Sequence, residues 1–225
     1  TMYKANFTDS TELPSYYCLR DAGYLTPVKH QLATGNCWAF ASLAALESCI
    51  LKANGTALDL SEENMKNMMH KYSVYGWTLE ANEGGYLDMA LAYFPSWLGP
   101  VYEEDDIFDD TSVLSPVLDS VLHIQNIIFV SRNNYLDNDA IKEAILKYGG
   151  VVTSLYSTGG SNQYSTKSNS NNHAVCVVGW DDNYSKSHFP SSSRPPGDGA
   201  WIVKNSWGTS WGNYGGYFYV SYYDA

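Results

Sequence analysis

The longest apolar stretch of the chain covers residues 38–51, directly after a polar loop. Almost every position in it is apolar or small, and Glu47 is its one charged residue. A helix that is apolar on all sides is normally buried on all sides. The pattern therefore predicts a buried helix that begins at Cys37, with Asn36 as its N-cap, and ends near the Asn-Gly turn at 54–55.

Two further helices are expected in the first half of the chain. Ser61 is of N-cap type and precedes an acidic first turn, which favours a helix to about residue 71. A glycine turn at 82–86 precedes a third helix that extends to about residue 94. The second half is richer in strands, and its predicted elements are a helix at 139–148 and strands at 121–130, 151–156, 173–180, 201–205 and 217–222.

This order of elements predicts an α+β fold with a cleft between a helical half and a strand-rich half, where sites tend to lie. Two long polar loops, 157–172 and 181–199, interrupt the second half. The acidic segment 103–112 does not have the spacing of an EF-hand calcium loop. We expect it to be a solvated loop.

Charge and hydropathy exclude several classes of function. The net charge of −11 argues against nucleic-acid binding, which needs a basic face. No apolar run approaches the roughly 18 residues of a membrane span, so no membrane insertion is expected. The chain opens without the apolar core of a signal peptide, and three glycosylation sequons, at Asn6, Asn54 and Asn183, favour a secreted or cell-surface protein.

Cys37 is the candidate nucleophile, because the free N–H groups and the dipole at a helix start favour a thiolate. Cys49 and Cys176 are expected to be small core residues, which leaves the pairing of Cys18 open. No pair of these cysteines has metal-ligand spacing. We expect no metal and no cofactor.

A cysteine nucleophile needs a base, and the base needs a group that orients it. His173 stands where a flexible loop enters an apolar strand, a position that holds a side chain rigidly at a cleft edge. Asn205 ends another strand and is of a type that can hydrogen-bond an imidazole, while Trp207 would shield that bond from water. Gln31, on the loop before Cys37, carries an amide that reaches toward the sulfur. The other four histidines remain structural candidates: His30, His70, His123 and His188.

Taken together, these motifs resemble the papain-like cysteine peptidases over about residues 12–225. The resemblance begins with Thr-Pro-Val-Lys-His-Gln at 26–31 and Cys-Trp-Ala-Phe at 37–40. It continues through Asn-Glu-Gly-Gly-Tyr at 82–86 and His-Ala-Val at 173–175, and it closes with Lys-Asn-Ser-Trp-Gly at 204–208. The order of these pieces and the separation of the cysteine from the histidine both fit the family.

The resemblance implies a two-domain fold with an active-site cleft between the domains. Residues 22–118 would form the helical domain that carries Cys37. Residues 1–21 and 119–225 would form a β-barrel domain that carries His173 and Asn205. Activity would be that of a cysteine endopeptidase, which cleaves polypeptides through a thioester.

The family also implies roles for the residues of the cleft. Cys37 would be the nucleophile, His173 the general acid and base, Asn205 its orienting residue and Gln31 an oxyanion-hole donor. The substrate would be a polypeptide in extended conformation. Its expected contacts are the backbone of Gly84 and Gly85, a pocket bordered by Tyr86, Ser154 and Ala174, the carbonyl of Asn172, and Trp207.

The chain departs from the family at its usual disulfide. Thr34 and Asn82 stand where the family has cysteines, so packing alone is expected to hold the loop before Cys37. These departures are more similar to microbial members, some of which are domains of larger surface or secreted proteins. A monomer is expected. Two alternatives remain open, an adhesion module on a retired peptidase scaffold and an isopeptidase or transpeptidase of cell-wall peptides.

Overall fold

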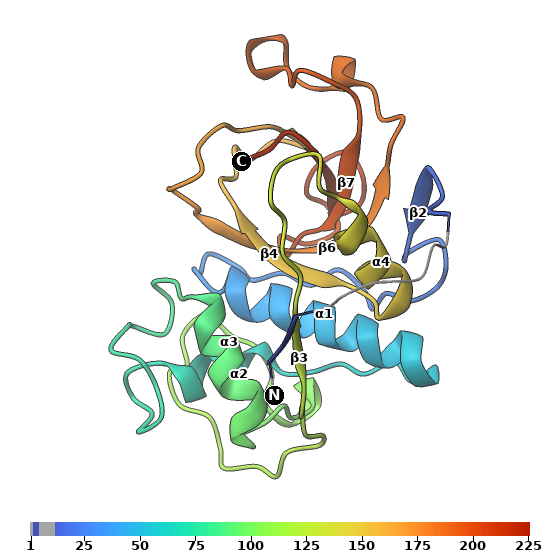
Figure 1. The fold of residues 1–225 in the computed structure, drawn as a ribbon. Coiled ribbons are helices and arrows are strands. Elements are labelled where there is room, and N and C mark those ends of the chain that lie inside the picture. Colours follow the sequence, from blue (N-terminus) through green and yellow to red (C-terminus); the bar gives the residue numbers. More distant parts are fainter. Residues whose placement is uncertain (1, 5–11) are drawn as a thin grey trace.

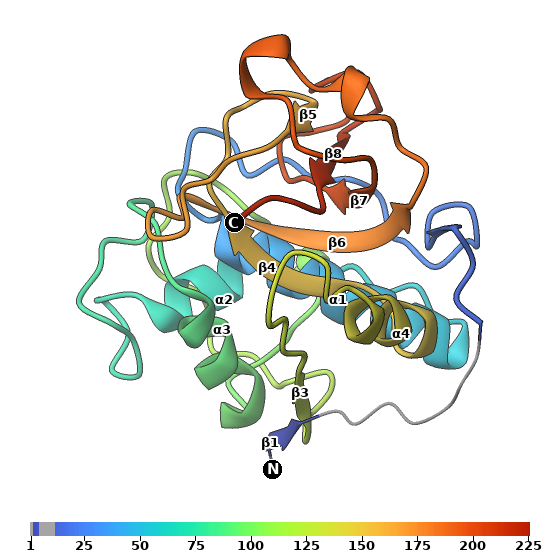
Figure 2. The ribbon, with the colours of Figure 1, turned by 45° about the horizontal axis from the view of Figure 1, so that its top comes forward.

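The computed structural model describes residues 2–4 and 12–225 (Figure 1). Its central helix, α1 (Cys37–Asn54), lies between a sheet on one side and two shorter helices on the other (Figures 1 and 2). Ala45 packs with the residues of the sheet, whereas Trp38 packs with those of the shorter helices. The helix is apolar on all sides because both of its sides are covered, as the sequence pattern predicted.

The sequence predicted a capping residue at each end of α1, and the two residues differ in how they cap the helix. The helix ends at Gly55, which has a left-handed φ of +76° and donates its N–H to the carbonyl of Leu51 at 2.9 Å, as a glycine C-cap does. Asn36 occupies the N-cap position at the start of the helix, as predicted, but its side chain makes no capping bond. Its Nδ2 instead donates to Oδ1 of Asn82 at 3.2 Å.

The two shorter helices are α2 (Glu62–Met69) and α3 (Leu87–Tyr93). Ser61 caps α2 as predicted, since its Oγ accepts the N–H of Asn64 at 2.9 Å. The helix ends about two residues earlier than predicted, and α3 continues into a 3₁₀ turn at Phe94–Ser96.

Glu47 is buried in α1, and its carboxylate has partners on two other segments. Its carboxylate accepts hydrogen bonds from Oγ1 of Thr26 at 2.5 Å and from the N–H of Leu60 at 2.9 Å. Nζ of Lys29 lies 3.3 Å from Glu47 and 3.0 Å from Glu62. A buried charge is tolerated only with such partners, and these fix the incoming chain against α1 and α2.

We expected the acidic segment 103–112 to be a solvated loop. In the structure its backbone also forms hydrogen bonds with a lysine of α2. Lys66 is fully buried, and its Nζ donates to the carbonyls of Asp109 at 3.0 Å and Ser112 at 2.9 Å. The same ammonium lies 2.8 Å from Glu63. The segment therefore accepts a buried lysine with its backbone, which its acidic side chains did not indicate.

Six strands form one sheet, in the order β2-β6-β7-β8-β5, with β4 pairing with β6 beside β2. Its centre, β6, is buried along eight of its nine residues, and it lies against α1. The strands of this sheet are β2 (Tyr16–Cys18), β4 (Val151–Leu155), β5 (Asn162–Gln163), β6 (His173–Asp181), β7 (Ala200–Lys204) and β8 (Tyr217–Ser221).

Outside the sheet, β1 (Met2–Lys4) pairs in parallel with β3 (Ile127–Phe129). The strand predicted over residues 121–130 is thus only three residues long. Most of that stretch is partly exposed, so no buried face extends the strand. The amphipathic helix α4 (Asp139–Lys147) forms as predicted and packs on β4 and β6. The remaining 3₁₀ turns are Glu103–Asp105, Lys186–His188 and Ser191–Ser193.

Candidate active site

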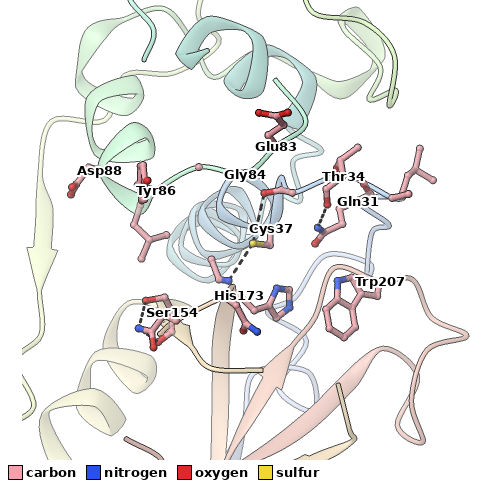
Figure 3. A pocket seen from close by; sticks show the side chains of 18 residues that line it. Gln31, Thr34, Cys37, Glu83, Gly84, Tyr86, Asp88, Ser154, His173 and Trp207 are labelled. Carbon is pink, nitrogen blue, oxygen red and sulfur yellow. Dashed lines mark hydrogen bonds between the residues drawn. The ribbon is translucent and has the colours of Figure 1, made fainter. Parts of the chain in front are cut away.

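Cys37 lies in the first turn of α1, in a cleft of about 670 Å³ whose walls come from both sides of the molecule (Figure 3). Across the cleft, the N–H of Ala174 in β6 donates to Sγ of Cys37 at 3.3 Å. Burial raises the pKa of this thiol, and hydrogen bonds from the N–H groups of Ala174, Trp38 and Cys37 oppose the rise. The helix start therefore does not produce a thiolate by itself, and the sulfur needs a base.

His173 precedes Ala174 at the start of β6 and lines the same cleft. Figure 3 shows its imidazole and the sulfur of Cys37 facing the same hollow. Nε2 of His173 lies 2.7 Å from Oδ1 of Asn205, which directly follows β7. β6 and β7 are paired antiparallel, with Cys176 opposite Lys204, so the start of β6 and the end of β7 lie at the same end of the sheet and bring the histidine close to the asparagine.

The amide of Asn205 determines which imidazole nitrogen carries the proton. Its Oδ1 also accepts the N–H of Ser206 at 2.9 Å, so this atom is an acceptor. Nε2 of His173 must then donate to it. In the neutral ring Nδ1 is left without a proton, and it is the nitrogen able to accept one from a thiol.

Trp207 covers the histidine. The two rings stack with centroids 4.5 Å apart and an angle of 26° between their planes. His173 is only 5% exposed, and this burial lowers the pKa of its imidazole, while the hydrogen bond that the imidazole donates to Asn205 raises it. A bond shielded from water in this way is stronger than an exposed one and holds the ring in one orientation.

Gln31 lies on the loop before α1 and is buried at the edge of the cleft. Its Nε2 donates to the carbonyl of Thr34 at 2.6 Å, and its Oε1 accepts from Oγ of Ser206 at 2.6 Å. The amide is therefore fixed in orientation. One of its two N–H bonds is used by Thr34, which leaves the second for a group in the cleft.

Hydrogen bonds, and not packing alone as we expected, hold the loop where the sequence lacks a disulfide. The N–H of Gly35 donates to the carbonyl of Asn82 at 2.9 Å. Nδ2 of Asn36 donates to the side chain of Asn82, and Oγ1 of Thr34 donates to the carbonyl of Gln31 at 2.6 Å. All four cysteines of the chain are free.

The glycine turn packs so closely against this loop and α1 that a side chain would not fit at Gly35 or Gly85. A Cβ on Gly35 would lie 2.5 Å from the backbone nitrogen of Gly84, and one on Gly85 would lie 2.4 Å from Nε1 of Trp38. Gly84 also has a left-handed φ of +118°. Its carbonyl lies 3.0 Å from Nε2 of His70, a fully buried histidine at the end of α2.

The remaining predicted site residues also reach the cleft. Gly84, Gly85, Tyr86, Ser154, Asn172, Ala174 and Trp207 all line it together with Cys37, His173 and Gln31. Asn205 lies one layer behind, in contact with His173. The side chain of Asn172 turns away into its own loop, where its Oδ1 accepts the N–H of Ser157 at 2.7 Å.

The other histidines have different surroundings, and none of them lines this cleft. His123 stacks on Trp97 at 3.9 Å between centroids, and His188 contacts Tyr184 at 4.6 Å. No group of three or more potential metal ligands is present within residues 2–4 and 12–225. In the same part of the chain, no helix has the length and apolarity needed to cross a membrane.

Sequence reasoning missed several residues that line the cleft and one buried residue that contacts its glycine turn. Glu83 and Asp88 line it, yet in the sequence they resemble ordinary surface acids beside a glycine turn. Asn171 also lines it and bonds Ser154, but it lies in a Ser- and Asn-rich loop without a local pattern. His70 showed no signal, since its contact with Gly84 joins segments 14 residues apart.

Comparison with known proteins gives a consistent result. The sequence model described as "Papain family cysteine protease" matches residues 13–224. "Probable cysteine protease RD19B" of Arabidopsis thaliana is 31% identical over 225 residues, which cover 95% of this chain and 60% of that protein. Pro-cathepsin H of Mus musculus is 31% identical over 96% of this chain and 63% of that protein.

A solved structure extends the comparison to the fold. The cysteine protease and lectin-like domains of Cwp84, a surface layer associated protein of Clostridium difficile, match with a TM-score of 0.81 and 31% identity. The match covers 100% of this chain and 50% of that one. This chain thus spans 60 to 63% of the length of the two curated relatives named above.

Proposed function

Because this chain belongs to the papain family of cysteine proteases, we propose that it is a cysteine endopeptidase with Cys37 as its nucleophile. The observation that carries the proposal is the arrangement around the sulfur. Ala174 donates to Sγ at 3.3 Å, and the neighbouring His173 is held by Asn205 at 2.7 Å with Nδ1 free to accept a proton. A nucleophile, a base and a group that orients the base are the set that acyl transfer requires.

The reaction begins with transfer of the Cys37 proton to Nδ1 of His173. The thiolate then attacks the carbonyl carbon of the peptide bond, and the oxygen takes the negative charge. The free N–H of Gln31 and the backbone N–H of Cys37 stabilise that oxyanion. These two donors are suited to the role because one amide is fixed by Thr34 and the other lies at a helix start.

Collapse of this intermediate breaks the C–N bond, and His173 gives its proton to the leaving amine. The acyl group remains on Cys37 as a thioester. His173 next takes a proton from a water molecule, which attacks the thioester carbonyl. The C–S bond breaks, the acid product leaves, and the thiol and neutral imidazole are restored.

An extended polypeptide is the proposed substrate, bound along the glycine turn. Gly84 and Gly85 carry no side chain to keep the peptide backbone at a distance. Tyr86, Ser154 and Ala174 border the pocket for the second residue before the scissile bond. Beyond that bond, the carbonyl of Asn172 and the ring of Trp207 contact the substrate, as all of these residues line one cleft.

We assign residues 22–118 to a helical domain and residues 1–21 and 119–225 to a β domain, which together form one peptidase unit. Two separate apolar clusters support this division, one centred on the sheet and one on α2 and α3. The two clusters meet at α1. Residue 1 and residues 5–11 lie outside the described part of the chain.

We also propose that this unit is a monomeric domain of a larger secreted or cell-surface protein. Cwp84 is described as surface layer associated and joins its protease domain to a lectin-like domain. Two of the predicted sequons, Asn54 and Asn183, are exposed, and the third, Asn6, lies outside the described residues.

The proposal is tested by incubating the chain and its Cys37→Ala variant with an unbiased peptide library. The unmodified chain should cleave peptides internally and Cys37→Ala should not, while Cys49→Ala, a change outside the cleft, should retain activity. Ligand binding without any cleavage would favour the adhesion module. Peptide products joined to an added amine, in place of free acids, would favour the transpeptidase.

A further inference from the structure

Next to the nucleophile, the cleft has a polar wall built on β4. Ser154 is paired with Ala174 in the sheet register, and Ala174 donates its N–H to Cys37. Ser154 is therefore one strand away from the residue that touches the sulfur. In Figure 3 it lies across the hollow from Tyr86 and Asp88. A substrate side chain next to the scissile bond would enter this space.

Asn171 determines what this wall offers to a ligand. Its Nδ2 donates a hydrogen bond to Oγ of Ser154 at 3.0 Å, so the nitrogen of this amide already has a partner. Its Oδ1 receives no hydrogen bond from any described residue. Asn171 is exposed and lines the cleft, so its Oδ1 is an acceptor that faces solvent.

The opposite wall, at the start of α3, is acidic and aromatic. Tyr86 is 61% exposed and presents its ring to the cleft. Asp88 and Glu83 line the same space, and neither carboxylate forms an ion pair or a side-chain hydrogen bond with another described residue. No lysine or arginine is among the residues that line this cleft.

From these two walls we infer that the second substrate residue before the scissile bond is lysine or arginine. The aliphatic stem of such a residue packs on Leu87 and Tyr86. Its cationic group donates to the carboxylate of Asp88 and to Oδ1 of Asn171, and it lies close to the aromatic ring. This assignment rests on the proposed function, because it names the substrate of the same site.

An aliphatic residue fits the two walls less well. It would cover Oδ1 of Asn171 and the hydroxyl of Ser154 without giving either a hydrogen bond, and an unpaired polar group loses its hydration at a cost. It would also leave the charge of Asp88 unmatched. Lysine and arginine satisfy these groups, so the structure favours them over leucine.

The test is a set of fluorogenic peptides that differ only in the second residue before the scissile bond. We expect kcat/KM for lysine and arginine to exceed that for leucine by about tenfold, the scale of one charge-assisted hydrogen bond. Asp88→Asn should reduce this preference several-fold, and added salt should weaken it because the charges are partly exposed. Asn171→Leu should raise kcat/KM for leucine.

The matched control is Glu104→Gln, which removes an exposed acid outside the cleft and should leave the preference unchanged. Asp88 and Asn171 are both exposed, so thermal melting should show that their variants remain folded. A leucine preference that neither variant alters would overturn the inference while leaving the peptidase proposal intact. Failure to cleave every peptide, together with an unreactive Cys37, would instead reject the proposed function.

Discussion

The amide oxygen of Asn205 lies 2.7 Å from Nε2 of His173, and it also accepts the N–H of Ser206 at 2.9 Å. The second bond fixes the amide, and the first fixes both the ring orientation and the proton position of the imidazole. The histidine thus presents an unprotonated Nδ1 to the cleft. In the proposed mechanism Asn205 acts through His173, as a positioning residue.

Replacement of Asn205 by alanine should lower kcat by roughly 100-fold, the scale of a misplaced catalytic group. KM should change little, because Asn205 does not line the cleft. Steady-state kinetics with one peptide measure both constants. Asn183→Ala, in an exposed loop, is the control. A kcat within threefold of the unmodified enzyme would show that the histidine is oriented without this amide.

The pH dependence of kcat/KM should be a broad bell. Burial lowers the pKa of His173 from its ordinary value of 6.5 and raises the pKa of Cys37 from 9.0. The active form holds one proton on this pair. A second proton should bind only below pH 6.5, and the last should leave only at alkaline pH. An acid limb with its midpoint at or above 6.5 would contradict this reasoning.

Loss of the Gln31 amide should act on the transition state. Gln31→Ala should lower kcat by about 10² to 10³, the usual effect of one oxyanion-hole donor, with a smaller change in KM. The variant also removes the bonds to Thr34 and Ser206, so its melting temperature must be measured beside its kinetics. A folded variant with unchanged kcat would remove Gln31 from the oxyanion hole.

Asp224 should make stability depend on pH. It is buried beside the N–H of Ser165, at 2.7 Å, and burial raises its pKa from 3.8 to about 7. The folded chain therefore holds a proton between these two pH values that the unfolded chain has lost. The free energy of unfolding, relative to Asp224→Asn, should fall as pH rises from about 4 to 7.

Urea unfolding of both proteins across this range checks that difference. The asparagine keeps an acceptor for the Ser165 N–H, so only the titration is removed. Two curves that remain parallel from pH 4 to 8 would mean that Asp224 titrates alike in the folded and unfolded chains.

The sequence was sufficient for features that local pattern and motif order carry. The apolar stretch predicted that α1 is a buried helix. Gly55 predicted where α1 ends, and Ser61 predicted where α2 begins. The predicted papain-like α+β fold is confirmed by the solved relatives. The separated residues Cys37, His173 and Gln31 line one cleft, with Asn205 directly behind it.

Features set by contacts between distant segments were not predictable in this way. Asn36 is of N-cap type, but its side chain forms a hydrogen bond with Asn82, which lies 46 residues away. The absence of the disulfide did not predict this hydrogen bond. Likewise, Lys66 is buried in the carbonyls of an acidic loop, which composition alone assigns to solvent. Local propensity loses to tertiary hydrogen bonding at both positions.

The most direct test of the account is titration with an epoxide that alkylates thiolates, followed by mass spectrometry of the labelled peptides. We predict one label per chain, at Cys37, and a loss of peptidase activity in proportion to labelling. Cys18, Cys49 and Cys176 should remain unlabelled, because burial raises the pKa of each of these thiols and, unlike Cys37, none of them lines the cleft with His173. Full activity after complete labelling of Cys37, or peptide cleavage by Cys37→Ala, would contradict the account.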